Sequence, residues 1–161
     1  MVNGKNKGST FERDIAKVFE EKLGIQFRRT PQSGAYVGGQ NKGSFLREDV
    51  TEILAGDLIA GDEDFPFCVE CKNYDNEPKL HHLLQGSSLT FNEWIAQATT
   101  DADMINKIPM LVFKIKRKGT FIAVPQIPEI DLDMTDADYL CYNNFIIMSM
   151  DNFFQRYEYD S

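Results

Sequence analysis

The chain has 161 residues, a length that suits a single domain built around one hydrophobic core. Hydrophobic residues make up 42% of it and charged residues 26%, and no apolar run approaches the ~20 residues that span a bilayer. We expect no secretory signal, because no positively charged start leads into an apolar stretch. Three cysteines in a chain of this size favour a reducing, cytoplasmic setting over a disulfide framework.

The negative charge is distributed unevenly along the chain, whose formal net charge is -8. Residues 1–118 hold 16 Lys and Arg against 17 Asp and Glu, whereas residues 119–161 hold one basic residue against 8 acidic ones. A negative total argues against tight, non-specific binding to nucleic acid, but affinity depends on the charge of the contacting face. The composition therefore excludes a uniformly basic protein and leaves room for a local basic surface.

Hydrophobic periodicity and turn residues predict a mixture of helices and strands, with no internal repeat. In chain order, we expect a helix at 9–23, strands at 25–29, 56–60 and 65–72, a helix at 89–106, strands at 110–115, 120–124 and 144–148, and a closing helix at 151–157. The remaining segments are expected to be a flexible arm at 1–8, long loops at 30–50 and 73–88, and an acidic loop region at 125–143. This order predicts an α/β fold, with helices flanking a mixed central β-sheet, in a single domain spanning residues 1–161.

Two helix starts carry capping patterns. Ser9 and Glu12 have the spacing of a capping box at the start of the first helix. Thr90 begins a second capping box, and Leu89 and Trp94 occupy the positions of a hydrophobic staple around it. We therefore expect the two helices to begin at these hydroxyl residues, and capping alone would account for Glu12.

Two carboxylates and a lysine are predicted to converge where two strands meet. Glu70 and Lys72 lie two residues apart on one strand, so their side chains share a face, and Asp57 lies at the start of the neighbouring strand. Oxygen ligands of this kind suit a hard cation such as Mg²⁺, and the backbone carbonyl of Cys71 could supply another. Such a cation could activate water at a phosphate while Lys72 orients the water and offsets charge. The alternative interpretation, a solvated and salt-bridged strand end, fits the spacing equally well.

Other potential ligands occupy less favourable positions. Cys68 and Cys71 have the spacing of a zinc or redox motif, but on a strand they point to opposite faces, and no second pair completes a ligand set. His81 and His82 lie in the irregular segment, where we expect a solvated loop. Gln97, one turn beyond Trp94 on the second helix, could face the site.

Four blocks of the sequence carry a family resemblance. They are Lys7–Asp14 (KGSTFERD), Phe27–Gly34 (FRRTPQSG), Gly56–Gly61 with Cys68–Lys72 (GDLIAG and CVECK), and Ile108–Lys114 (IPMLVFK). In this order they resemble archaeal-type Holliday junction resolvases and their bacteriophage relatives in the PD-(D/E)xK nuclease superfamily. Residues 146–154 are also similar to the ending of some phage members. The resemblance implies a restriction-endonuclease-like core, in agreement with the α/β pattern.

The resemblance also implies an activity: a Mg²⁺-dependent endodeoxyribonuclease, with Mn²⁺ as a substitute, that acts as a homodimer on four-way or other branched DNA. It implies that Glu12, Asp57 and Glu70 are acidic site residues that hold the metal, that Lys72 is the catalytic lysine and that Ser33 lies near the scissile phosphate. Such an enzyme would serve recombination or repair in the cytoplasm of a bacterium or a phage-infected host cell, away from membranes.

Basic residues in two segments are candidates for contacting the DNA backbone. Residues 1–29 hold 7 Lys and Arg against 4 acidic residues, and a second basic cluster lies near the turn at Lys118. The candidates are Lys5, Lys7, Arg28, Arg29, Lys116 and Arg117. Two alternatives remain open: a duplex or single-strand nuclease of the same fold in recombination, repair or restriction, and a non-catalytic DNA- or protein-binding module on a nuclease fold.

Overall fold

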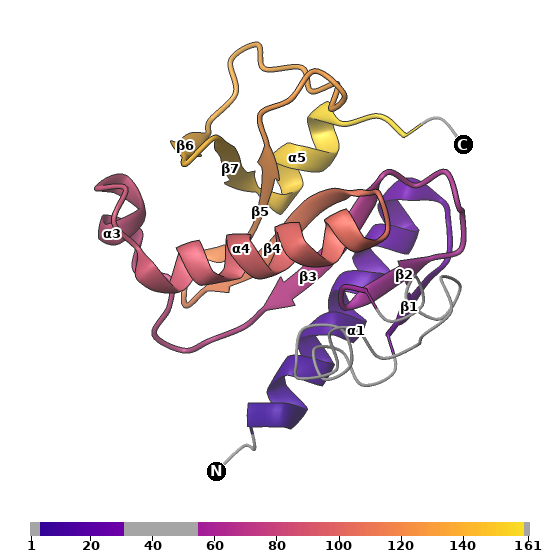
Figure 1. Ribbon diagram of the computed structural model, residues 1–161, viewed down its shortest axis with the longest axis horizontal. Helices are drawn as coiled ribbons and strands as arrows, with labels where there is room; N and C mark the ends of the chain where they lie inside the picture. Colours follow the sequence, from indigo (N-terminus) through magenta and orange to yellow (C-terminus); the bar gives the residue numbers. More distant parts are fainter. Residues whose placement is uncertain (1–3, 31–54, 160–161) are drawn as a thin grey trace.

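Figure 1 shows a mixed β-sheet with helices packed on both of its faces. The computed structural model describes residues 4–30 and 55–159, with side chains from residue 6 onward. Its helices are α1 Gly4–Leu23, α3 Leu80–Leu84, α4 Leu89–Met104 and α5 Met150–Arg156. Its strands are β1 Phe27–Arg29, β2 Leu58–Ala60, β3 Phe67–Lys72, β4 Ile108–Ile115, β5 Gly119–Pro125, β6 Leu140–Tyr142 and β7 Phe145–Ser149. The predicted α/β fold with a mixed central sheet is confirmed.

The directions of the strands place the end of β3 and the chain that follows β5 at opposite ends of the sheet. The order is β1-β2-β3-β4-β5-β7-β6; β3 and β4 run parallel, and the other neighbouring pairs run antiparallel. Because β3 and β4 run parallel, Lys72 at the end of β3 lies at the same end of the sheet as the β4–β5 turn at 116–118. β5 runs antiparallel to β4, so the chain beyond Pro125 leaves from the opposite end of the sheet, at the top of Figure 1.

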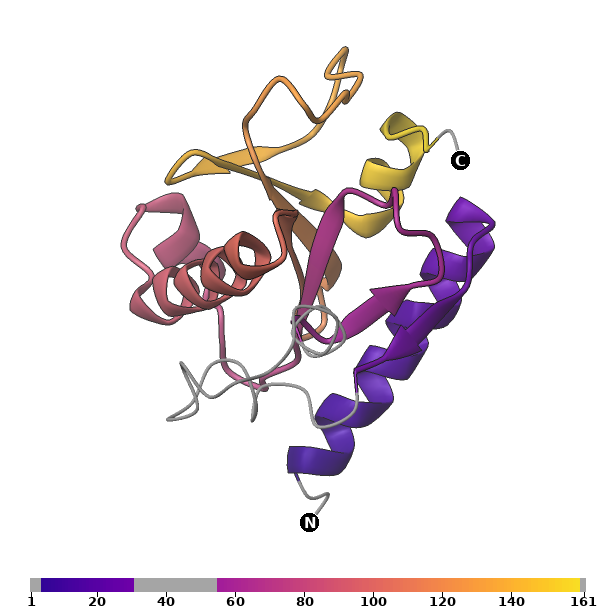
Figure 2. The same cartoon turned by 45° about the vertical axis from the view of Figure 1, so that its right-hand side comes forward.

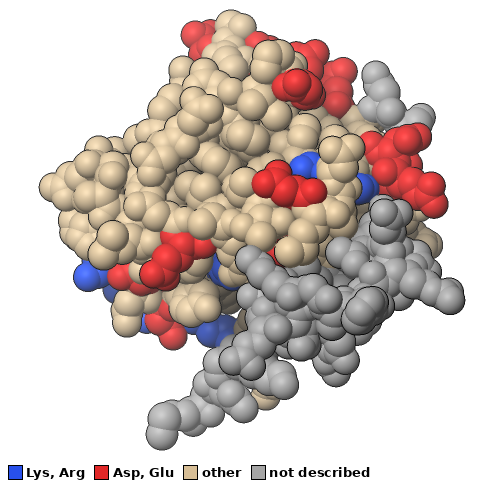
Figure 3. Space-filling model, in the orientation of Figure 1, with Lys and Arg blue, Asp and Glu red and all other residues tan. Residues whose placement is uncertain are grey.

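The segment at that opposite end, residues 126–139, is acidic. Its charged residues are Glu129, Asp131, Asp133, Asp136 and Asp138. Red atoms accordingly follow the upper margin of the face shown in Figure 3, on which few Lys or Arg side chains are visible. Part of the expected acidic loop region is a strand, however, since β6 pairs with β7 as far as Tyr142. The buried Tyr142 ring, packed on Phe91, gives this short strand its anchor.

Alternation along the strands divides the core between two helical layers. Val69 and Val112 face one side of the sheet, which α1 and α5 cover. Leu111 and Phe113 face the other side, which α4 covers through its own apolar stripe. Figure 2 shows these two layers on either side of the strands. Because Glu70 is in register with Leu111 on β4, it faces the α4 side.

Helix α1 begins earlier than the capping pattern predicted. It starts at Gly4, so Ser9 lies inside the helix and half of the expected flexible arm is helical. Two contacts account for the added turn: the Thr10 hydroxyl donates to the Asn6 carbonyl at 2.9 Å, and Lys7 forms an ion pair with Asp75. Within the described ranges, α1 and the other helices lack the combination of length and apolar character that crossing a membrane requires.

The start of α4 also differs from the prediction. Its N-cap is Ser88, whose hydroxyl accepts from the Phe91 N–H at 3.2 Å, and not Thr90. Leu89 is 79% exposed, so the expected hydrophobic staple does not form. Trp94 is buried because it packs against the core ring of Phe91.

The expected irregular segment before α4 contains the short helix α3, which bears His81 and His82. Leu83 on this helix is buried, which explains why a full turn forms where no capping pattern is visible. The two imidazole rings contact one another, with centroids 4.3 Å apart. The expectation of a loop at these histidines was therefore wrong.

Candidate active site

Asp57 is fixed between two strands by its backbone and by its carboxylate. Its N–H donates to the Val69 carbonyl at 2.7 Å, and its carbonyl accepts from the Thr30 N–H at 2.9 Å. Its Oδ2 accepts a hydrogen bond from the Cys71 N–H at 2.8 Å. The preceding residue, Gly56, has a φ of +70°, and a Cβ there would lie 2.8 Å from the Val69 carbonyl oxygen. Glycine at position 56 therefore allows the close approach that places Asp57.

Glu70 and Lys72 project from the same face of β3, as their spacing predicts. The Lys72 Nζ donates to Glu70 Oε1 at 2.8 Å and to Gln97 Oε1 at 2.8 Å. Gln97 belongs to α4, so the ammonium group is held between the sheet and the helix that covers it. Glu70 is only 3% exposed, so its ion pair with Lys72 forms in a largely water-free environment.

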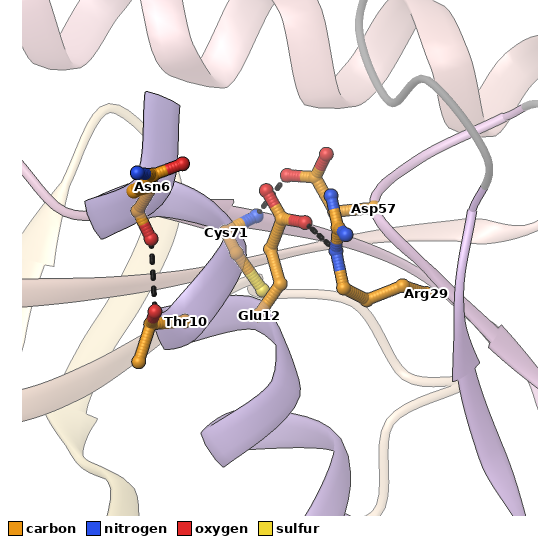
Figure 4. A network of polar contacts seen from close by, with 6 residues as sticks. All are labelled: Asn6, Thr10, Glu12, Arg29, Asp57 and Cys71. Carbon is orange, nitrogen blue, oxygen red and sulfur yellow. Dashed lines mark hydrogen bonds and ion pairs between the residues drawn. The ribbon is translucent and has the colours of Figure 1, made fainter. Parts of the chain in front are cut away.

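Glu12 enters the same region from the opposite layer. It lies on α1, is buried at 8% exposure, and forms an ion pair with Arg29 of β1. Figure 4 shows Glu12 and Arg29 beside Asp57 and the backbone of Cys71. The pair neutralises the Glu12 carboxylate and leaves the Arg29 guanidinium close to Asp57.

The three carboxylates, Lys72 and Gln97 all line one cleft, which has a volume of about 400 Å³. Asp57, Glu70 and Lys72 line it from the sheet, Glu12 from α1 and Gln97 from α4. The cleft therefore lies where two helical layers meet the end of β3, at the same end of the sheet as the β4–β5 turn.

Burial and the neighbouring Asp57 carboxylate raise the proton affinity of Glu70. Burial first, and then the Asp57 carboxylate, raise the pKa of Glu70 to about 8, although Lys72 opposes the shift. Burial alone would lower the pKa of Lys72, but Glu70 and Asp57 outweigh burial and raise it, so the ammonium stays charged. A divalent cation bound beside these two buried carboxylates would reduce the repulsion between them, which the single ammonium group offsets only in part.

The donor set fits a hard cation. Asp57 and Glu70 offer carboxylate oxygens, and Cys71, whose carbonyl is a further possible donor, follows Glu70 on β3 and lines the same cleft. Among the residues described, no three His, Cys, Asp or Glu side chains come together closely enough to form an all-protein cage. Mg²⁺ commonly uses one or two carboxylates and completes its shell with water and substrate phosphate, so two carboxylates at an open cleft suit it.

The two cysteines of the CxxC spacing are arranged differently from a zinc pair. Cys68 packs with Ala55 and Ala102, whereas Cys71 lies in the core on the opposite face of β3. Burial raises the pKa of Cys68 to about 12 and that of Cys71 well above its usual value. Both thiols are therefore protonated, and zinc binds the thiolate form.

The comparison with known families shows which family this chain belongs to. Residues 3–160 match the family described as "Phage putative PDDEXK endonuclease". The chain belongs to this family. It is a PD-(D/E)xK endonuclease with the restriction-endonuclease-like fold, as the sequence resemblance implied, and such nucleases act on DNA and generally depend on a divalent metal.

Two individual proteins are similar to this phage-type nuclease. Protein D14 of Escherichia phage T5 is 26% identical over 126 residues, which cover 76% of this chain and 71% of the relative. A Holliday junction resolvase of Archaeoglobus fulgidus, Hjc, superposes with a TM-score of 0.41 at 14% identity, covering 94% of this chain and 95% of Hjc.

Of the candidate DNA-contacting residues whose side chains the structure describes, one lines the cleft and the others lie elsewhere on the surface. Lys7 lines the cleft and is paired with Asp75, and Arg29 is paired with Glu12. Arg28 is exposed on β1, and Lys116 and Arg117 are exposed in the β4–β5 turn. Ser33 and the Lys5 side chain lie outside the described residues.

Several residues of the nuclease cleft were not predicted from the sequence, and two of them carry an aromatic or a charged side chain. Tyr74 and Asp75 follow Lys72 closely and line the same cleft. Their position just after the D–ExK motif was the available signal, but the pattern of the segment indicated only an irregular loop. Gly56 was predicted to bound a strand, and its close contact with β3 follows only from the pairing of the strands.

Proposed function

We propose that this nuclease is a Mg²⁺-dependent endodeoxyribonuclease that cuts branched DNA, with the four-way junction as its preferred substrate. The observation that carries the catalytic part is the convergence of buried Asp57, buried Glu70 and the doubly held Lys72 on one open cleft. A salt-bridged strand end exposed to solvent would leave the carboxylates hydrated, whereas here they are buried at 5% and 3% exposure.

Each residue of the cleft has a distinct proposed role. Asp57, Glu70 and the Cys71 carbonyl hold the cation, with Glu12 as a further acidic group on the α1 side. A divalent cation bound there supplies Lewis acidity toward a phosphodiester. The Lys72 ammonium, fixed in direction by its two acceptors, orients the attacking water and offsets the negative charge that develops on the phosphate.

The DNA-binding surface is proposed to surround the cleft. Lys5, Lys7, Arg28 and Arg29 would contribute to it from α1 and β1, and Lys116 and Arg117 from the β4–β5 turn. Ser33 is proposed to lie near the scissile phosphate. The preference for branched DNA and the action as a homodimer rest on the resemblance of the four sequence blocks to junction resolvases.

One cleavage assay tests this proposal. A labelled four-way junction and a linear duplex of matched sequence are incubated with the protein and Mg²⁺, Mn²⁺, Ca²⁺ or EDTA. We expect cutting with Mg²⁺ and Mn²⁺, faster on the junction, and little cutting with Ca²⁺ or EDTA. Equal cutting of both substrates would indicate a duplex nuclease of the same fold. Binding without cutting under every metal condition would indicate a non-catalytic module and would overturn the catalytic proposal.

A further inference from the structure

An exposed aromatic ring lies at the mouth of the cleft. Tyr74 is 55% exposed and lines the same cleft as Lys72 and Gln97. It follows the end of β3 by two residues, so it stands immediately beside the group proposed to act on the phosphate. The roles proposed above leave this ring without a function.

The ring rests on a rigid support. Its centroid lies 5.4 Å from that of Trp94, with the two rings tilted by 33°. Trp94 is 5% exposed and is held in turn against Phe91 and Phe113 in the core. One side of the Tyr74 ring is therefore backed by the core, which lowers the entropy that the side chain would lose on binding a ligand.

Groups suited to phosphate lie next to the ring. Asp75 forms an ion pair with Lys7 of α1. Lys7 first, and Lys116 more weakly, lower the pKa of the Asp75 carboxyl, so a cation of the β4–β5 turn also comes near this residue. Cations and an exposed aromatic ring side by side are the two elements that bind a single nucleic-acid strand: the cations its backbone, and the ring its bases.

We propose that Tyr74 is a stacking site for an unpaired nucleobase adjacent to the phosphate that is cut. The inference rests on the proposed function, because it requires DNA in the cleft. A base can reach the ring only when it has left the duplex stack, and every base presents a π face. The site would therefore select for branch points, gaps and flaps while remaining tolerant of sequence.

The test uses the DNA that the protein cuts, once the position of the cut is known. Each of the two nucleotides on either side of the cut is replaced in turn by an abasic residue, which removes the base and keeps the phosphates. Affinity is measured with Ca²⁺ in place of Mg²⁺. Emission from Trp94, the single tryptophan of the chain, gives a second readout that is independent of cleavage.

Three variants isolate the ring. Tyr74→Leu removes the aromatic face but still covers Trp94, so a base cannot simply stack on the indole instead. Tyr74→Phe keeps the face and removes the hydroxyl. Tyr139→Leu is the matched control, since Tyr139 is similarly exposed at 50% but precedes β6 at the far end of the sheet.

We expect the wild type to lose at least about fivefold in affinity when the base at one of these positions is missing. Tyr74→Phe and Tyr139→Leu should keep this dependence, and Tyr74→Leu should lose both the dependence and the change in Trp94 emission. If Tyr74→Leu still distinguishes base from abasic DNA, or if the wild type does not, the stacking site is wrong while the proposed nuclease function stands. If the protein neither binds nor cuts any DNA, both proposals fall.

Discussion

The amide oxygen of Gln97 lies 2.8 Å from the ammonium nitrogen of Lys72, and this contact ties α4 to the strand that bears the carboxylates. A lysine side chain has four rotatable bonds and a compact charge, so a single acceptor fixes it poorly. With Glu70 as its second acceptor, the Lys72 ammonium points in one direction before substrate arrives. The helix that covers the sheet is thereby part of the proposed catalytic site.

Removing this contact should slow the chemical step. We expect Gln97→Leu to lower kcat by about tenfold, an effect of ~1.4 kcal/mol on the barrier, with little change in KM or in the unfolding midpoint. Single-turnover cleavage with Mg²⁺ measures it. Glu93→Gln, one turn earlier on the same helix and exposed, is the control and should behave as wild type. A larger effect on KM than on kcat would show that Gln97 contacts DNA directly.

Replacing either central carboxylate should abolish cleavage without unfolding the protein. Asp57→Asn keeps an acceptor for the Cys71 N–H, and Glu70→Gln keeps the volume of a residue that is 3% exposed. Asp57→Asn removes charge from a repulsive cluster, and Glu70→Gln replaces a buried carboxyl whose pKa is raised to about 8 by a neutral group of the same volume, so we expect stability near or above that of the wild type. Cleavage rates and thermal unfolding are measured together. Residual activity above about a tenth of the wild-type rate, only ~1.4 kcal/mol of barrier, would contradict the assignment.

The stability of the metal-free protein should fall as the pH rises. The pKa of Glu70 is raised from 4.5 to about 8, so the folded state holds this proton more tightly than the unfolded state does. The resulting stabilisation is fully present below the unfolded pKa and is lost as the pH rises through the folded pKa. In EDTA, the unfolding midpoint should therefore decrease between about pH 5 and pH 8, and Glu70→Gln should flatten this dependence.

Mg²⁺ should counteract this loss of stability at high pH, because the cation binds the deprotonated Glu70 carboxylate and its binding releases a proton. Mg²⁺ should raise the unfolding midpoint more at about pH 8 than at about pH 5. An equal Mg²⁺ effect at both pH values, or an unchanged pH dependence in Glu70→Gln, would show that Glu70 is not the group that titrates.

Gly56→Ala should cost more stability than the loss of a positive φ alone. Gly24 has a φ of +73°, and a Cβ added there would meet no atom within 4 Å, so Gly24→Ala measures the backbone contribution, roughly 1–2 kcal/mol. At Gly56 the φ is similar, but the new Cβ would meet the Val69 carbonyl oxygen at 2.8 Å and Cys68 Sγ at 2.9 Å. Urea unfolding of both variants checks the difference. Equal losses of unfolding free energy in the two variants would mean that β3 shifts to accommodate the new Cβ without a further loss of stability.

The β4–β5 turn should contribute to DNA affinity through charge alone. We expect Lys116→Ala combined with Arg117→Ala to lower the salt slope of junction binding by about two units, one for each phosphate contact. The effect should be similar for junctions of different sequence, because backbone contacts carry no sequence information. A salt titration in Ca²⁺ measures it, and an unchanged slope would place this turn outside the DNA-binding surface.

The arrangement of side chains on β3 was predictable because its geometry is local. Alternation along one strand puts Glu70 and Lys72 on a common face, and two adjacent strands joined by a short turn bring Asp57 near them. The pairing of Glu12 with Arg29 was not predictable in the same way, since it depends on how α1 packs against β1. A sequence pattern gives the buried stripe of a helix but not its rotation relative to a strand.

The errors in the predicted element boundaries have long-range causes. Ser88 and Thr90 both carry hydroxyl groups, and the choice between them as N-cap is settled by Tyr142, whose hydroxyl donates to the Ser88 carbonyl and accepts from its N–H. The extra turn of α1 is stabilised by Lys7 and Asp75, which are 68 residues apart. Contacts of this kind leave no trace in local periodicity.

The acidic segment 126–139 lies at the end of the sheet opposite the cleft. This position affects how the molecule approaches its substrate. The excess negative charge is concentrated at one end, so the protein carries an electric dipole despite its unfavourable total charge. We therefore expect DNA to be repelled from the acidic end more than from the end with the proposed cleft, which would orient the molecule during diffusion so that the cleft faces the DNA. Acidity that weakens random encounters therefore raises the share of encounters that are correctly oriented.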